Sequence, residues 1–250
     1  MNVADKLLRI AENVEKNVEY GKSQGGGGDP TEAFLDIYLE GGNRQRIAYA
    51  FAGDVWTEEM LRKIKHVIKP IETKTNDRYA MGTFFRLNRN GTELMDFTEI
   101  CKKFDFSECN DLSNLFHNAR VKNVTINASK ARTLSQSFAS GDSGAIEGVT
   151  LTVSSVCVDF YNSFYYQSGL TEIRFTEGSV IAANINFQRS ALLTAESYHS
   201  IMKALSSTVT GKTINLPAYA TVSSTYNAVF GEGSWDILAA SKSNWTIAYA

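Results

Sequence analysis

Proline, cysteine and an excess of either charge are scarce in this chain of 250 residues. It has three prolines, and its three cysteines, Cys101, Cys109 and Cys157, are odd in number and widely spaced. Such a set fits neither a disulfide framework nor a zinc site, which needs closely paired ligands. The 25 basic and 27 acidic residues leave a net charge of −2 with no basic stripe. This balance argues against nucleic-acid binding, because nothing neutralises a phosphate backbone.

Long apolar runs are missing as well. No stretch approaches the roughly 18 apolar residues that a membrane-spanning helix needs. Residues 1–20 carry charges throughout, without the apolar core or cleavage site of a secretory signal. We therefore expect synthesis in a reducing cytoplasm, no signal peptide and no membrane insertion.

The chain does contain an imperfect repeat that ends in phenylalanine. The segments LSNLF, LSQSF and FYNSF end at Phe116, Phe138 and Phe164, and a weaker copy ends at Phe187. Earlier copies with longer spacings end at Phe51 and Phe85. After three of the copies comes a short alternating strand, with apolar residues Val124 and Ile126, then Val149, Leu151 and Val153, then Ile173 and Phe175. Spacings in the twenties are typical of a solenoid, so we predict one over 78–190. Such proteins usually present a surface and do not enclose a catalytic cleft.

Residues 1–24 predict an amphipathic helix that makes the protein a homo-oligomer. Its seam has coiled-coil spacing and consists of Val3, Leu7, Ile10, Val14 and Val18. An isolated helix of this length is marginal in water, so it must dock on something. Self-association into a dimer or trimer is one possibility, and packing on the rest of the chain is the other.

The other segments predict a linker, an adaptor and an end unit. The run GGGGDP makes 25–30 a flexible linker. We interpret 31–77 as a helical adaptor or N-terminal cap with a helix start at Thr57. In 191–250, Thr194 caps a helix of about three turns, and GKTINLP and NWTIAYA read as strands. This last segment is expected to cover the end of the solenoid as a C-terminal cap.

Residues that could carry chemistry are dispersed. Gly21-Lys22-Ser23 resembles the end of a phosphate-binding loop, but Lys16 stands where that motif needs glycine. No G-x-S-x-G motif occurs, and acidic residues such as Asp159 and Glu172 are typical of a solvated face. The histidines, His66, His117 and His199, lie in separate segments. We therefore predict no enzyme activity, no catalytic residues, no cofactor and no metal.

One aromatic cluster could bind a ligand. The segment DFYNSFYYQS contains Tyr161, Tyr165 and Tyr166, and Arg174 follows on the neighbouring predicted strand. If the phenylalanines of this segment are buried, at least two of the tyrosine rings should be exposed. Exposed tyrosines offer rigid contact area with a polar tip, which suits sugars and protein partners. The alternative is that they stack along the surface as ordinary neighbours.

Two parts of the sequence resemble a known family. The repeats, together with the ending LTAESYHSIMKALSSTVTGKTINLP … SKSNWTIAYA, resemble the BspA-like irregular leucine-rich-repeat proteins of gut bacteria and their phages. The opening ADKLLRIAENVEKNVEYGKSQGGGG resembles a phage-encoded group often found among tail or virion-surface genes. The resemblance covers the opening 28 residues and roughly 105–250. It implies attachment or a structural role, not chemistry.

The sequence thus predicts an α+β chain with an N-terminal coiled-coil helix, an irregular leucine-rich-repeat β-solenoid and a helix-strand C-terminal cap. We expect a non-enzymatic protein of a phage virion, in the tail or a fibre, that attaches to a host cell-surface glycan or protein. Its other partners would be itself and further virion proteins. The alternatives are a purely structural decoration protein of the capsid or baseplate, and a bacterial surface adhesin.

Overall fold

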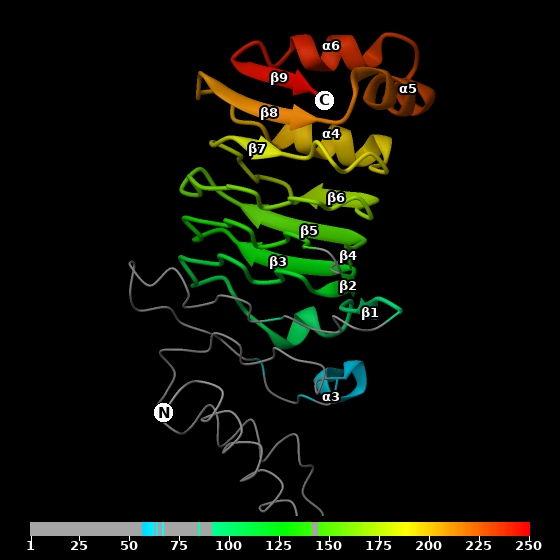
Figure 1. Cartoon of the computed structure of the whole chain (residues 1–250). Coiled ribbons are helices and arrows are strands. Elements are labelled where there is room, and N and C mark those ends of the chain that lie inside the picture. Colours follow the sequence, from blue (N-terminus) through cyan, green and yellow to red (C-terminus); the bar gives the residue numbers. More distant parts are fainter. Residues whose placement is uncertain (1–56, 63, 65–66, 68–84, 86–91, 142–144) are drawn as a thin grey trace, which may run out of the picture.

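The computed structural model describes residues 57–62, 64, 67, 85, 92–141 and 145–250 (Figure 1). The predicted oligomerisation seam, the linker and most of the adaptor lie outside these residues. Within them, no helix has the length and apolarity that crossing a membrane requires. Figure 1 shows the strands stacked in chain order, with the helices of the C-terminal part beside and beyond them.

Short strands and helices alternate with long turn segments. The strands are β1 (Met95–Asp96), β2 (Arg120–Lys122), β3 (Val124–Ala128), β4 (Ala145–Ile146), β5 (Gly148–Val153), β6 (Glu172–Phe175), β7 (Ile185–Asn186), β8 (Lys212–Leu216) and β9 (Trp245–Tyr249). The helices are α3 (Glu58–Arg62), the 3₁₀ helix η1 (Cys101–Lys103), α4 (Ala195–Ala204), α5 (Tyr219–Phe230) and α6 (Ser234–Ala240). All strand pairs are parallel, which places equivalent residues of successive segments side by side.

The predicted leucine-rich-repeat β-solenoid is wrong. The described strands form three separate three-stranded sheets, in the orders β1-β2-β4, β3-β5-β6 and β7-β8-β9, and no closed or continuous sheet runs through them. The repeat segments end in phenylalanine, where a leucine-rich repeat would have leucine. The coiled-coil part of the same prediction falls on residues outside the described ranges.

Two local features divide the sheets. Asn123 lies between β2 and β3 with a left-handed backbone, φ 58°, which bends the chain there and ends the first ladder. Beyond β6, helix α4 stands where the next strand would pair. The backbone N–H groups of Ile173 and Phe175 donate to the hydroxyls of Ser197 (3.0 Å) and Ser200 (2.8 Å) of this helix. The edge of β6 is thereby satisfied by side chains, and β7 starts a new sheet.

The strands predicted from the repeat are confirmed as β3, β5 and β6, and the structure supplies their register, which the uneven spacing of the repeat left open. Val124, Val149 and Ile173 are aligned across the three strands, and Ile126, Leu151 and Phe175 form the next row. Both rows are buried. A side-chain period of two explains this, because every second residue of a strand faces the same side.

A second wall of backbone lies opposite the strands and consists of the turn segments that end in phenylalanine. Its turns are hydrogen-bonded to one another in register, for example from Leu112 N–H to the Thr133 carbonyl (3.1 Å) and from Leu134 N–H to the Asp159 carbonyl (2.8 Å). Buried serine hydroxyls reinforce this turn wall. Ser163 donates to the Leu134 carbonyl at 2.7 Å, and equivalent bonds run from Ser137 to Leu112 and from Ser190 to Gln167.

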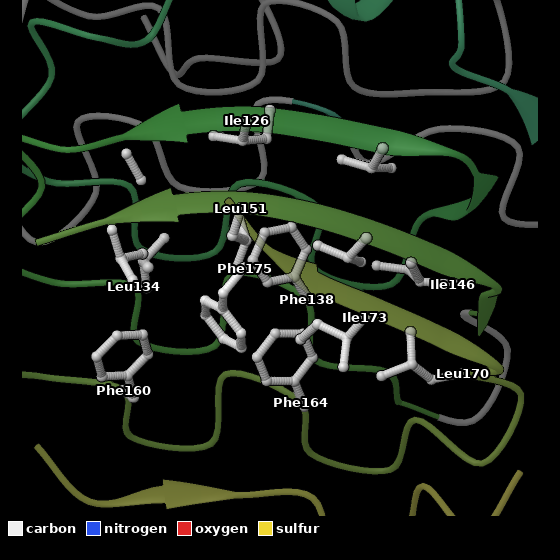
Figure 2. Close-up of a cluster of buried hydrophobic side chains, with 14 of the residues drawn as sticks. Ile126, Leu134, Phe138, Ile146, Leu151, Phe160, Phe164, Leu170, Ile173 and Phe175 are labelled. Atoms are coloured by element: carbon white, nitrogen blue, oxygen red, sulfur yellow. The ribbon is translucent and has the colours of Figure 1, made fainter. Parts of the chain in front are cut away.

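The core between the two walls contains a column of phenylalanine rings. Ring centroids lie 4.8 Å apart for Phe85 and Phe116, 5.9 Å for Phe116 and Phe138, 5.2 Å for Phe138 and Phe164, and 4.8 Å for Phe164 and Phe187. Figure 2 shows the middle rings packed with strand residues such as Leu151 and Ile173. Burying one such ring stabilises the fold by about 1.5–3 kcal/mol. The earliest predicted copy, ending at Phe51, lies outside the described residues.

The C-terminal part contains the predicted elements and two helices more. Thr194 caps α4 by accepting a hydrogen bond from the Ser197 N–H, and β8 and β9 are the strands predicted from GKTINLP and NWTIAYA. Helices α5 and α6 were not predicted, because YATVSSTYNAVF is rich in β-branched and aromatic residues of low helix propensity. Tertiary packing supports α5 instead, since Val222 and Tyr226 are buried and Tyr226 contacts Trp235.

Candidate ligand-binding surface

The three tyrosines lie on the outer side of the turn wall. Phe160 and Phe164 are buried in the core, as the binding hypothesis required, whereas Tyr161, Tyr165 and Tyr166 expose 67%, 43% and 49% of their surface. The expectation of at least two exposed rings is therefore confirmed. Whether they bind a ligand stays a prediction.

Their arrangement joins aromatic faces, hydroxyls and one cation. Tyr165 and Tyr166 meet edge to face, with ring centroids 4.2 Å apart and planes at 71°. A hydrogen bond with the Tyr166 side chain is the main cause that raises the pKa of Tyr165 above its usual value. The guanidinium carbon of Arg189 lies 5.7 Å from the centroid of the Tyr166 ring, within cation–π range. We call Tyr161, Tyr165, Tyr166 and Arg189 the tyrosine patch.

Tyr166 occupies an uncommon backbone conformation. Its φ is 56°, in the left-handed region, which costs an L-residue about 1–2 kcal/mol and is rare for a bulky side chain. Two residues after an earlier repeat phenylalanine, Asn118 has nearly the same angle, 60°. Asparagine suits this position because its short polar side chain tolerates it. A tyrosine is the costlier choice there, and such outliers gather at functional sites.

The backbone under the patch is held on several sides. The carbonyls of Tyr161 and Tyr165 accept hydrogen bonds of 2.9 Å from the N–H groups of Gln136 and Ser140 in the preceding turn. The N–H of Tyr161 donates to a carboxylate oxygen of Asp159, also at 2.9 Å. The patch is thus carried by ordered main chain, and binding would cost little backbone entropy.

Arg174, the cation predicted from the sequence, belongs to a different surface. It lies on β6 between Ile173 and Phe175, both of which face the core, so its side chain points outward from the strand wall. There its guanidinium pairs with the carboxylate of Glu172. The structure therefore groups the three tyrosines but leaves Arg174 on the other side of the core.

Arg189 was missed although the repeat contained the signal for it. Aligning the copies on their phenylalanines places Arg189 two residues after Phe187, just as Tyr166 comes two residues after Phe164. Equivalent positions of successive turns are neighbours in this fold, so the cation follows the tyrosine along the stack.

The other residues considered for chemistry have structural partners. Asp159 accepts from the Thr133 hydroxyl (3.0 Å) as well as from Tyr161, and Glu172 pairs with Arg174 on the opposite wall. His199 contacts the Tyr226 hydroxyl at 2.9 Å between its Nδ1 and that oxygen. In the described part of the chain, no three metal-ligating side chains gather as a metal site would require. His66 lies outside it.

None of the three cysteines is in a disulfide. Burial is the main reason why the pKa of Cys101 is raised to about 11 and that of Cys157 to about 12. Both thiols therefore stay protonated at neutral pH, whereas nucleophilic chemistry needs the deprotonated thiolate.

The tyrosine patch offers ring faces, phenolic hydroxyls and a guanidinium on a fixed backbone, which suits recognition of a polar ligand at the surface. Comparison with known proteins adds no closer description: no family model matches the chain, and no curated protein or solved structure is significantly similar to it.

Proposed function

We propose that the protein is a non-enzymatic virion component, of a phage tail or fibre, that attaches to a host cell surface through the tyrosine patch. The observation that supports this most is Tyr166, a bulky residue kept in a costly left-handed conformation on an exposed surface. A position that served only the fold would be filled better by asparagine or glycine. The resemblance to surface proteins of gut phages supports the same function.

Attachment would be multivalent. The predicted seam of Val3, Leu7, Ile10 and Val14 would join copies of the chain, and the linker 25–30 would let each copy reorient. Joining sites in this way raises the effective concentration at the second contact and turns weak binding into firm attachment. Light scattering after size exclusion, on the full chain and on a Leu7→Asp, Ile10→Asp variant, tests this step. A dimer or trimer that becomes a monomer in the variant is the expected result.

The attachment test uses the fluorescently labelled full chain and intact cells of a panel of gut bacteria. The wild type should label some strains, and Tyr161→Ala combined with Tyr165→Ala should remove the labelling. Tyr219→Ala is the control, because Tyr219 is about as exposed as Tyr165 but lies on α5, where its hydroxyl donates to Asp236. Equal labelling by the double variant and the wild type would reject the patch as the attachment site.

A second candidate is a structural decoration protein of the capsid or baseplate. Large apolar side chains are exposed on α5 and α6, namely Val229, Phe230 and Ile237. Exposed apolar groups of this kind favour contact with another protein. This function predicts that Ile237→Lys, but not the tyrosine variants, prevents incorporation into particles, which particle sedimentation followed by immunoblotting would show.

A further inference from the structure

We propose that the ligand of the tyrosine patch is an acidic polysaccharide whose sugar rings carry carboxylates, and that Arg189 binds the carboxylate. This inference rests on the proposed attachment function and specifies its ligand. It starts from the charge of Arg189 and the faces of the surrounding rings.

Arg189 is an exposed cation that no described carboxylate neutralises. Its recorded contact in the described ranges is the ring of Tyr166. Four other cations of the described residues are paired with carboxylates: Arg62 with Glu58, Lys102 with Glu99, Lys130 with Glu108, and Arg174 with Glu172. A guanidinium held over a ring keeps its forked N–H donors directed outward, and this fork matches a carboxylate. The patch is therefore complementary to a single negative charge.

The tyrosines supply the rest of a sugar site. Tyr161 is the most exposed of them, at 67%, and its ring is open to an apolar sugar face. The side chains of Tyr165 and Tyr166, which are hydrogen-bonded to each other, provide phenolic hydroxyls that can form hydrogen bonds with the hydroxyls of the sugar.

A carboxylate attached to the sugar ring fits this spacing better than other anions. The guanidinium carbon of Arg189 lies 5.7 Å from the centroid of the Tyr166 ring. The sugar ring and the negative charge of the ligand must therefore lie close together. A uronic acid carries both in one residue. Phosphate groups of a wall polymer lie between residues, and a phosphate monoester would carry nearly two charges against one cation.

The arrangement also explains why Tyr166 keeps its energetically costly left-handed backbone. Its ring contacts both the guanidinium of Arg189 and the ring of Tyr165. Asparagine at this position, as at 118, would relieve the backbone but release the cation. Tyr166 is thus a positioning residue for the guanidinium of Arg189, which binds the ligand.

The test measures binding of the full chain to polygalacturonate and to the same polymer after its carboxylates are reduced to alcohols, by affinity electrophoresis. The wild type should bind the acidic polymer and lose at least about tenfold in affinity toward the reduced one, the size of one charge-assisted contact. Arg189→Ala should lose a similar factor toward the acidic polymer alone. Arg174→Ala is the matched control and should bind like the wild type. Raising NaCl from roughly 0.05 to 0.5 M should weaken wild-type binding but not that of Arg189→Ala.

The possible outcomes separate this inference from the proposed function. Equal binding of acidic and reduced polymer, or no effect of Arg189→Ala, overturns the acidic ligand while attachment through the tyrosines stands. Loss of cell labelling in the tyrosine variant without binding to either polymer also overturns it, in favour of a neutral glycan or a protein ligand. If the tyrosine variant still labels cells, the proposed attachment site itself is rejected.

Discussion

The backbone N–H of Ile173 donates a hydrogen bond of 3.0 Å to the hydroxyl of Ser197. Ile173 lies on the edge strand β6 and ends the buried row that begins with Val124 and Val149, and Ser197 is a buried residue in the first turn of α4. In a longer sheet, the next strand would accept this bond. Here a helix takes that role with a side chain, and the sheet ends without an unpaired buried N–H.

Ser197→Ala should lower the free energy of unfolding by about 1–3 kcal/mol, because it leaves the Ile173 N–H buried and unsatisfied. Urea denaturation followed by circular dichroism measures this change. Ser224→Ala, an exposed serine in helix α5, is the control and should stay within about 0.5 kcal/mol of the wild type. Equal effects of the two substitutions would mean that α4 does not hold the edge of β6.

Phe138→Ala should cost about 3–5 kcal/mol, the usual range for a large ring removed from a core. The ring lies between Phe116 and Phe164, and the gap would interrupt the column. The urea midpoint of this variant is to be compared with that of Tyr161→Ala, which truncates an exposed ring on the same wall. A small loss in both would show that the phenylalanine column contributes little to stability.

Tyr166→Asn should leave the free energy of unfolding within about 0.5 kcal/mol of the wild type. Relief of the left-handed backbone, about 1–2 kcal/mol, offsets the lost contacts with Tyr165 and Arg189. Tyr165→Asn is the control, because Tyr165 has an ordinary backbone and should show the loss of contacts without the relief. A loss well above 1.5 kcal/mol for Tyr166→Asn, in the same urea experiment, would contradict a strained Tyr166.

Stability should fall as the pH rises above about 9. The unfolded thiols ionise near pKa 9.0, whereas in the fold burial raises the pKa of Cys101 to about 11 and that of Cys157 to about 12. The folded state therefore binds more protons between these values, and an increase in pH favours unfolding. Tyr198, whose pKa burial raises from 10.0 to about 12, acts in the same direction.

Urea midpoints at pH 8 and pH 10.5 test this dependence, and a Cys101→Ala, Cys157→Ala variant should show a smaller decrease between the two pH values. In the native protein at pH 8, both thiols should also react slowly with a thiol reagent, with full reaction only after unfolding. A fast native reaction would contradict their protonated, buried state.

The local parts of this fold were predictable from the sequence. The alternation of Val149, Leu151 and Val153 identified β5, and the apolar pairs after the other repeat phenylalanines identified its neighbours β3 and β6. Thr194 marked the start of α4 for a reason that is purely local, namely a side chain that caps an N–H.

What failed depended on contacts between segments. The bend at Asn123 and the replacement of a strand by α4 come from one backbone angle and two serine bonds, which no apolar pattern reveals. The exposed tyrosines followed from the buried phenylalanines beside them. The structure places Arg174 on β6, apart from the tyrosines, whereas Arg189 lies beside Tyr166, because equivalent positions of successive turns are neighbours.

The location of the residues two positions after each repeat phenylalanine affects how the surface can evolve. Asn118, Ser140, Tyr166 and Arg189 occupy this position in successive turns, and successive turns of a hydrogen-bonded stack are spaced by about 4.7–4.9 Å. Ser140 is buried, whereas the side chains of Tyr166 and Arg189 reach the surface in adjacent turns. Both lie outside the phenylalanine column, so an exchange at either turn alters the surface that a polymer would meet and leaves the interior unchanged. The surface can therefore acquire a new ligand preference one turn at a time.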